Sequence, residues 1–308
     1  MLTLILVLLI LLVLAEGWTL LLRCRRGHPG WKLLRQYRYA HRGYHDKPHI
    51  PENSMAAFHR AIENGFGAEL DVHLLKDGHL AVIHDASLKR TAGADVLVED
   101  LTSEELKAYR LEGTDERIPL LDEVLALFEG KTPLVVELKP ERGNHAELAA
   151  ATCALLDRYR VDYCIESFDP RVVGIVRRQA PEVLRGQLAD SYQSNRRTGV
   201  KAVSAFAFSH CLGNMLGRPD FIAWCPDERN WAVRLCAALG AMMVMWTALP
   251  EHDTEKLEKD YSITLREREF VEEYEALLQT MGKDAVIRRE NKTKPRKKKS
   301  ALDEAKDG

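Results

Sequence analysis

Short apolar runs alternate with helical patterns along most of the chain. The runs are rich in aliphatic and β-branched residues, as buried strands are, and they occupy residues 38–41, 68–74, 80–84, 134–139, 163–168, 184–188, 221–224, 242–247 and 285–287. Apolar residues at helical spacing predict helices over residues 54–64, 103–111, 121–128, 145–159, 171–179, 231–238 and 255–281. Alternating strands and helices imply a parallel sheet. About eight such units in roughly 270 residues favour a (β/α)8 TIM-type barrel over an open doubly wound sheet.

The first 22 residues form an apolar segment that only Glu16, Gly17 and Thr19 interrupt. About 20 apolar residues suffice to span a bilayer as a helix. A cleaved signal peptide is the rival interpretation, but no Lys or Arg precedes the apolar run, as such a signal requires. A buried core helix is disfavoured because the run has no polar face. Residues 1–22 are therefore predicted to be a transmembrane anchor that precedes the barrel.

Basic residues follow the anchor directly. The segment 23–36 contains Lys and Arg but no Asp or Glu, and the first acidic residue after Arg23 is Asp46. Because Lys and Arg stay on the cytoplasmic side of a membrane span, we expect a single-pass membrane protein with the body of the chain in the cytoplasm. Segment 23–36 is predicted to be a basic juxtamembrane linker. The six cysteines form no Cys-x-x-Cys pair, and free thiols fit a reducing compartment.

Charge and composition exclude several classes of protein. The 308 residues carry 44 Lys plus Arg against 46 Asp plus Glu, and 46% are hydrophobic, which excludes a disordered chain and a polytopic membrane protein. The net charge of −2 is a sum in which a basic tail is offset by acidic residues elsewhere. This tail is predicted to be disordered over residues 291–308. This tail either stays solvated or binds anionic lipids beside the anchor. Nucleic acid is not expected, because no aromatic residue is interleaved with these charges. The remaining segment, 37–290, has the length of one barrel.

Polar residues cluster where the predicted strands end. In a (β/α)8 barrel the chemistry takes place at the carboxyl ends of the strands, so these residues are candidates for one site. Three of them are carboxylates that would form a hard, all-oxygen ligand set for Mg²⁺ or Ca²⁺, namely Glu69, Asp71 and Glu137. Glu69 and Asp71 are two residues apart on a strand and therefore point to the same side. The alternative is that one or more of these acids are structural and form salt bridges.

Two histidines and two cations complete this set of candidates. His41 and His84 end predicted strands, and imidazole can accept or donate a proton near neutral pH. Arg42 and Lys139 offer positive charge that suits a phosphate group. A divalent metal, two histidines and two cations together describe a site for hydrolysis of a phosphate ester. A diester is preferred because two acid/base groups are most useful when the leaving group is a poor alkoxide.

At this point the sequence resembles a known family, the glycerophosphodiester phosphodiesterases. The resemblance spans roughly residues 39–247 and is specific only in its combination of motifs. Its strongest runs are His41-Arg42-Gly43, Pro51-Glu52-Asn53-Ser54, Glu69-Leu70-Asp71-Val72, Lys76-Asp77-Gly78 and Val82-Ile83-His84-Asp85. Further runs are Leu101-Thr102-Ser103-Glu104-Glu105-Leu106, Ile118-Pro119-Leu120-Leu121-Asp122-Glu123-Val124-Leu125 and Glu137-Leu138-Lys139. Weaker echoes are Ser167-Phe168, Arg218-Pro219-Asp220-Phe221 and Trp246-Thr247.

The resemblance implies a (β/α)8 barrel that hydrolyses glycerophosphodiesters to glycerol 3-phosphate and an alcohol. It implies a divalent metal at the three carboxylates and general acid/base roles for His41 and His84. Arg42 and Lys139 would contact the phosphate, with Asn53 nearby. The indole of Trp246 would line the glycerol or alcohol side of the pocket, although it could equally pack in the core.

The chain departs from the family pattern after Trp246. Ala248-Leu249-Pro250 follows the Trp-Thr pair where the family usually carries a polar residue, and the last strand is expected only at 284–287. The anchor adds a second candidate activity, because it would hold the site within reach of lipids. This alternative is a lysophospholipase D-type reaction on lysophospholipids. A catalytically silent, anchored binding or scaffold protein is the rival from another class, but the intact acids and histidines argue against it.

Overall fold

The computed structural model describes residues 1–225, 229–248, 261 and 263–266. The chain divides into two units, residues 1–268 and 269–308, and the second unit lies outside the described residues. The strand expected at 284–287 and the basic tail expected over 291–308 fall within that second unit. The description below therefore concerns the first unit alone.

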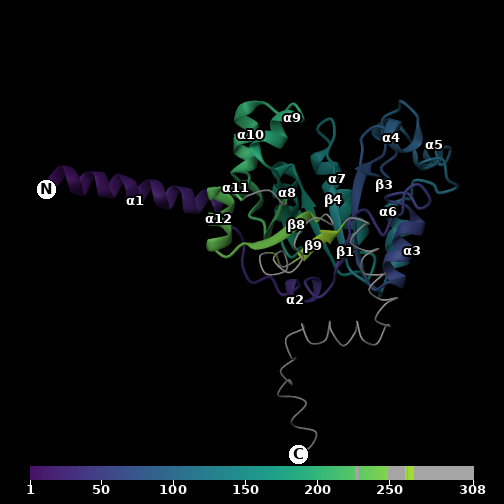
Figure 1. Ribbon diagram of the computed structural model, residues 1–308, viewed down its shortest axis with the longest axis horizontal. Coiled ribbons are helices and arrows are strands. Elements are labelled where there is room, and N and C mark those ends of the chain that lie inside the picture. The colour runs from purple at the N-terminus through teal and green to yellow at the C-terminus, as the bar shows by residue number, and fades with distance from the viewer. Residues whose placement is uncertain (226–228, 249–260, 262, 267–308) are drawn as a thin grey trace, which may run out of the picture. The chain divides into compact units, whose positions relative to one another are not determined.

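Eight parallel strands form a ring in the described part of the chain (Figure 1). The pairings of β1 with both β2 and β9 close this ring, so the fold is a TIM-barrel-like α/β fold, as the sequence pattern predicts. The strands of the ring, in the order of their neighbours, are β1 (Tyr39–Ala40), β2 (Gly67–Leu74), β4 (Leu134–Leu138), β5 (Tyr163–Ser167), β6 (Arg185–Ala189), β7 (Phe221–Trp224), β8 (Met242–Ala248) and β9 (Ile263–Arg266).

One predicted strand lies outside the ring. β3 (Leu80–Val82) runs antiparallel to β2, with Val72 opposite Val82. The chain reverses here because Leu75 donates its backbone N–H to the carbonyl of His79 at 2.8 Å, and Gly78 takes a left-handed φ of 86° in the turn. The run at 80–84 is therefore the second arm of a hairpin rather than a strand of the barrel, and it places His84 beside the end of β2.

Helices connect the strands, and several begin where the sequence predicts. Ser54 caps α3 by accepting the N–H of Ala57, and Thr102 forms a capping box with Glu105 at the start of α5. The helices are α1 (Leu2–Leu22), α2 (Trp31–Leu34), α3 (Met55–Glu63), α4 (Lys89–Ala92), α5 (Ser103–Leu106), α6 (Leu121–Phe128), α7 (His145–Leu156), α8 (Pro170–Gln179), α9 (Tyr192–Arg197), α10 (Ala202–Ser209), α11 (Asn214–Gly217) and α12 (Trp231–Ala238), with a 3₁₀ turn η1 (Val98–Asp100).

Two predictions about the chain after β6 were wrong. The helix expected over 255–281 is interrupted by β9, which pairs with β8 and β1. Ile263 and Leu265 alternate along β9 and are buried in the barrel core, a period-two pattern that the surrounding charged residues hide in the sequence. In addition, α9, α10 and α11 fill the connection between β6 and β7, where no helix was predicted.

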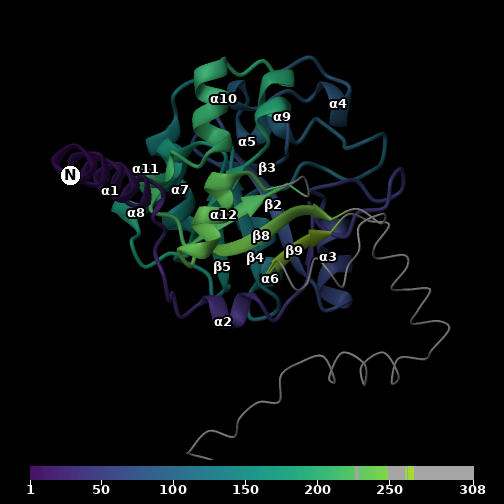
Figure 2. The ribbon, with the colours of Figure 1, turned by 60° about the vertical axis from the view of Figure 1, so that its left-hand side comes forward.

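The core of the barrel is closed at the end where the strands begin. Trp31 of α2 packs on Phe221 with ring centroids 5.6 Å apart, and Tyr39 donates its hydroxyl to the carbonyl of Leu34 at 2.9 Å. Phe221 fits only because residue 186 is glycine, since a Cβ there would lie 2.0 Å from its ring. In both views α2 lies at the opposite end of the barrel from α9 and α10 (Figures 1 and 2).

The segment that joins α1 to the barrel is itself packed. Arg25 donates to both carboxylate oxygens of buried Asp220 at 2.6 Å, and it also bonds the carbonyl of Val183 at 2.8 Å. Asn214 of α11 donates to the carbonyl of Leu22 at 3.1 Å. The residues expected to form a linker over 23–36 thus contribute contacts to the domain, while the limits of anchor, linker, barrel and tail remain predictions.

Among the described residues, one helix is long and apolar enough to cross a bilayer. It covers Thr3–Leu22 with a mean hydropathy of 2.7, and its most apolar stretch has no buried residue. The side chains of Leu4 to Leu14 are all exposed. Length and composition alone lead to this assignment, and a secretion signal shares both properties.

We expect Trp31→Ala to lower the free energy of unfolding by about 3–5 kcal/mol, because a buried indole leaves a cavity at the closed end of the barrel. Lys32→Ala is the matched control, since Lys32 lies on the same turn of helix and is exposed. Its expected effect is within about 0.5 kcal/mol. Denaturant titration of the purified protein measures both, and equal effects would show that α2 does not close the core.

Candidate functional site

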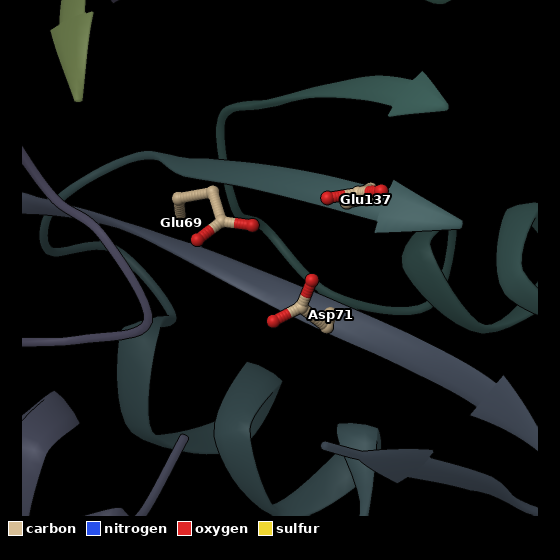
Figure 3. A group of neighbouring side chains, drawn as sticks. All are labelled: Glu69, Asp71 and Glu137. Carbon is tan, nitrogen blue, oxygen red and sulfur yellow. The ribbon is translucent and has the colours of Figure 1, made fainter. Parts of the chain in front are cut away.

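Three buried carboxylates lie together at the carboxyl end of the barrel strands. Glu69 and Asp71 belong to β2, and Glu137 lies directly opposite Asp71 on β4. One oxygen atom of each acid lies within 4.8 Å of the others. Figure 3 shows the three carboxyl groups gathered from the two neighbouring strands. The structure therefore brings together the acids for which the sequence predicts a metal site.

Burial makes the charges of these acids costly. Burial, followed by the negative charges of Asp71 and Glu137, raises the pKa of Glu69 well above its usual range. Burial likewise raises the pKa of Glu137 to about 7, although the ammonium group of Lys139 opposes the shift. A cation held among the three oxygens would relieve both the burial cost and the repulsion.

Lys139 provides part of this compensation. Its Nζ lies 3.0 Å from Asp71 Oδ1 and 2.6 Å from Glu137 Oε1. Burial opposes the charge of Lys139, but the two carboxylates outweigh burial and raise the pKa of its ammonium group. In return, the pKa of Asp71 is held below its usual range despite burial, chiefly by Lys139 and then by His84 and Arg42.

Arg42 and Asn53 bind the same acids from two loops. The backbone N–H of Arg42 donates to Glu69 Oε2 at 2.9 Å, and Asn53 Nδ2 donates to Asp71 Oδ2 at 2.8 Å. Arg42 and Asn53 both take left-handed backbone conformations, with φ of 55° and 53°, and Asn53 N–H donates to the carbonyl of Arg42 at 2.8 Å. Strained backbone of this kind persists where the surroundings hold side chains in a required position.

The two histidines flank the carboxylates in different surroundings. His41 Nε2 lies 3.8 Å from Glu69 Oε2. His84 Nδ1 lies 2.6 Å from Asp85 Oδ1, which leaves Nε2 as the ring nitrogen available to a substrate. Burial lowers the pKa of His84, even though Asp71 and Asp85 favour its charged form. An imidazole held neutral in this way is suited to accept a proton.

Four residues that the sequence did not single out support this arrangement. Asp85 is held by Arg90 at 2.6 Å, and Arg90 also donates to Glu52 at 2.6 Å. Glu52 accepts from Arg42 Nη1 at 2.9 Å, which connects both loops of the site. His73 is buried and lies 3.2 Å from the carbonyl of His84. Asp85 and Glu52 stand within the recognised motifs, whereas Arg90 and His73 carry no signal in the sequence.

Trp246 lies farther from the acids than the other predicted residues. Its indole N–H donates to the carbonyls of Ala223 and Ala189 at 3.2 and 3.3 Å, and the ring packs against the barrel core. It contacts half-exposed Phe168 edge to face at 5.2 Å, and the ring of Phe168 lies 5.9 Å from Lys139 Nζ. Trp246 is thus both a core residue and a neighbour of the site through Phe168.

The donor set fits a hard divalent cation. The cluster offers three carboxylates and no thiolate or imidazole. Mg²⁺ and Ca²⁺ prefer such oxygen ligands, whereas Zn²⁺ is usually bound by thiolate or imidazole. Asn53 Oδ1 and Glu166 Oε2 are also buried without a hydrogen-bond partner among the described residues. Beside these oxygens stand a guanidinium, an ammonium and two imidazoles, so the site can bind an anionic ester and move protons at its oxygens.

Comparison with known proteins supports the same conclusion. The sequence model of the glycerophosphoryl diester phosphodiesterase family matches residues 41–288. A glycerophosphodiester phosphodiesterase of Caldanaerobacter subterraneus subsp. tengcongensis is 38% identical over 159 residues, which is 48% of this chain and 65% of the relative. A lysophospholipase D of Rattus norvegicus is 38% identical over 125 residues, 36% of this chain and 38% of the relative. The chain thus spans less than two thirds of the length of either curated relative.

Solved structures share the fold. A phosphodiesterase of Oleispira antarctica, solved in complex with the product sn-glycerol-3-phosphate, superposes with a TM-score of 0.63 over 79% of this chain and 95% of that chain, at 24% identity. This likeness concerns the fold alone, while the family model covers every barrel strand after β1 and every predicted site residue. The chain belongs to the glycerophosphoryl diester phosphodiesterase family.

Proposed function

We propose that the protein hydrolyses glycerophosphodiesters to glycerol 3-phosphate and an alcohol in a metal-dependent reaction. The proposal rests chiefly on the cluster of three buried carboxylates, Glu69, Asp71 and Glu137. Arg42 and Lys139 both form ion pairs with Asp71 of this cluster. Relatives named glycerophosphodiester phosphodiesterases and the fold shared with a product-bound phosphodiesterase support it.

Charge balance favours a diester as substrate. The three carboxylates outnumber the cations Arg42 and Lys139 by one charge. A bound Mg²⁺ or Ca²⁺ would therefore leave one net positive charge among these groups, which matches the single negative charge of a phosphodiester. The metal would supply Lewis-acid stabilisation of the charge that develops on the phosphate oxygens. Arg42 and Lys139 orient the phosphate, and Asn53 holds Asp71 in place.

The histidines carry the proton transfers. His84, oriented by Asp85, and His41, beside Glu69, flank the acids, so one accepts the proton of the nucleophile and the other protonates the leaving alkoxide. Phe168 and Trp246 would line the side of the pocket that receives the glycerol or alcohol part of the substrate.

We further propose that α1 anchors the protein in a membrane with the catalytic domain in the cytoplasm. The apolar helix is followed directly by the basic residues Arg23, Arg25 and Arg26. Membrane lipids would then be partners of the anchor and of the basic tail. Lysophospholipase D activity is the second candidate, favoured by the likeness to the rat enzyme and by the nearness of an anchored site to lipids.

Product analysis tests the activity and the roles of the histidines. With glycerophosphocholine and a lysophosphatidylcholine as substrates, we expect release of choline, with glycerol 3-phosphate as the second product of the former. His41→Ala and His84→Ala should each lower turnover by about 10²-fold or more. His79→Ala is the control, because His79 is half exposed and bonds only turn residues among the described part of the chain. Full activity in both site variants would exclude the proposed proton transfers.

Metal binding can be tested without activity. We expect Glu69→Gln to weaken Mn²⁺ binding, measured by calorimetry or electron paramagnetic resonance, by roughly tenfold or more. Glu147→Gln is the control, since Glu147 is exposed in the first turn of α7 and lies outside the cluster of three. Chelation should also abolish turnover, and Mg²⁺ or Ca²⁺ should restore it. Equal affinity in wild type and Glu69→Gln would rule out this metal site.

Topology can be tested by thiol labelling in intact cells. The six native cysteines are buried, so Lys107→Cys on the exposed surface of α5 introduces a selective label. We expect this thiol to react with a membrane-impermeant reagent only after lysis, and the protein to stay with the membrane at alkaline pH. Labelling of intact cells would place the catalytic domain on the other side of the membrane.

A further inference from the structure

Large apolar side chains gather on the outer surface of the β6–β7 connection and of α12. Five of them are between 43% and 83% exposed, namely Val203, Phe206, Met215, Leu216 and Trp231. We call these five residues the apolar face. Soluble domains rarely leave contiguous apolar surface uncovered, so such a face marks a contact with a partner or a membrane.

The apolar face is continuous with the end of α1. Trp18 of α1 packs edge to face on Trp231 at 5.2 Å, Trp231 lies 5.7 Å from the ring of His210, and His210 stacks on Phe206 at 4.1 Å. Both views show α11 and α12 beside the end of α1 (Figures 1 and 2). A row of aromatic rings therefore leads from the apolar helix onto the surface of the barrel domain. Tryptophan at this position is typical of the boundary between a bilayer and water.

The segment that carries most of the apolar face contains basic but no acidic residues. From Ser191 to Arg218 the chain contains four Lys or Arg and no Asp or Glu. Three of the four, Arg196, Arg197 and Lys201, are exposed. Aromatic and aliphatic side chains flanked by basic residues are the composition of elements that lie in the interface of an anionic bilayer.

The face also lies on the catalytic side of the barrel. α9 and α10 follow the carboxyl end of β6, and the metal-site acids lie at the carboxyl ends of β2 and β4. α2 closes the opposite end (Figure 2). A surface that holds α10 on the bilayer therefore keeps the open end of the barrel close to lipid.

We propose that the apolar face is a membrane-contact surface, seated in the head-group region of the bilayer that α1 enters. The inference rests on the proposed anchor and deepens the proposed function, because it places the catalytic end where a lysophospholipid leaves the membrane. A second copy of the chain or residues 267–308 are other possible occupants. The lipid bilayer is chosen because the face continues the apolar helix α1, and because the segment 191–218, which carries most of the face, has basic but no acidic residues.

Fluorescence quenching in lipid tests this surface directly. Val203→Cys carries an environment-sensitive fluorophore, since Val203 is 83% exposed and the six native cysteines are buried. The full chain is reconstituted in vesicles of phosphatidylcholine and phosphatidylglycerol. We expect nitroxide lipids labelled near the head group to quench this probe at least about threefold more than a probe at Lys107→Cys, which lies outside the face. A probe at Leu8→Cys reports on α1 itself.

The outcomes separate the two proposals. If lipid quenches the Leu8 probe but not the Val203 probe, the anchor stands and the membrane-contact surface is wrong. If neither is quenched, the anchor fails and the surface fails with it. A blue shift of the Val203 probe that depends on protein concentration would assign the face to a second copy of the chain. A blue shift that persists without lipid would assign the face to the chain itself. Either result would overturn the inference.

A variant of the face gives a second measurement. The triple change Phe206→Ser, Met215→Ser and Leu216→Ser removes apolar surface far from the acids. We expect roughly tenfold lower turnover of lysophospholipid in vesicles, with turnover of soluble glycerophosphocholine unchanged. Equal loss on both substrates would indicate damage to the fold, and the quenching at Val203 would then decide. No loss on vesicles together with an unquenched Val203 probe would refute the surface.

Discussion

Mutual repulsion among three buried carboxylates is the constraint on which the site depends. Glu69, Asp71 and Glu137 share one end of the barrel because β2 and β4 are paired in register, and burial deprives them of water. Lys139 and the N–H of Arg42 offset only part of the cost. The remaining negative charge is the basis for the proposal that the cluster holds a divalent cation.

Precision at this site comes from a second layer of ion pairs. Glu52 joins Arg42, Lys47 and Arg90, and Arg90 continues to Asp85, which orients His84. Removing one member would therefore move more than one group of the site. The core at the other end of the barrel gives this layer a rigid base, since the ring of Phe221 fills the space beside Gly186 and Trp31 of α2 packs on it.

The two ends of the barrel have different surroundings. One end is sealed by residues that follow α1, so the segment after the apolar helix is part of the folded domain. The other end holds the acids and is bordered by α9 and α10, whose outer side is apolar and basic. The apolar helix α1, the aromatic row and the open end together are the basis for the proposed membrane-contact surface.

The apolar helix, the parallel barrel and the candidate acids, cations and histidines could be predicted from the sequence, because strand periodicity and strand-end motifs are local patterns. The folded chain was needed to show that 80–82 is a hairpin arm and that 263–266 closes the barrel, since both depend on which strand edge is free to pair. The fold likewise explains the support of His84 by Arg90 and His73. Arg90 joins Asp85 to Glu52, which is distant in sequence, and His73 reaches His84 only through the hairpin. The apolar face arises in the same way: its residues become one surface only when α10, α11 and α12 pack beside α1.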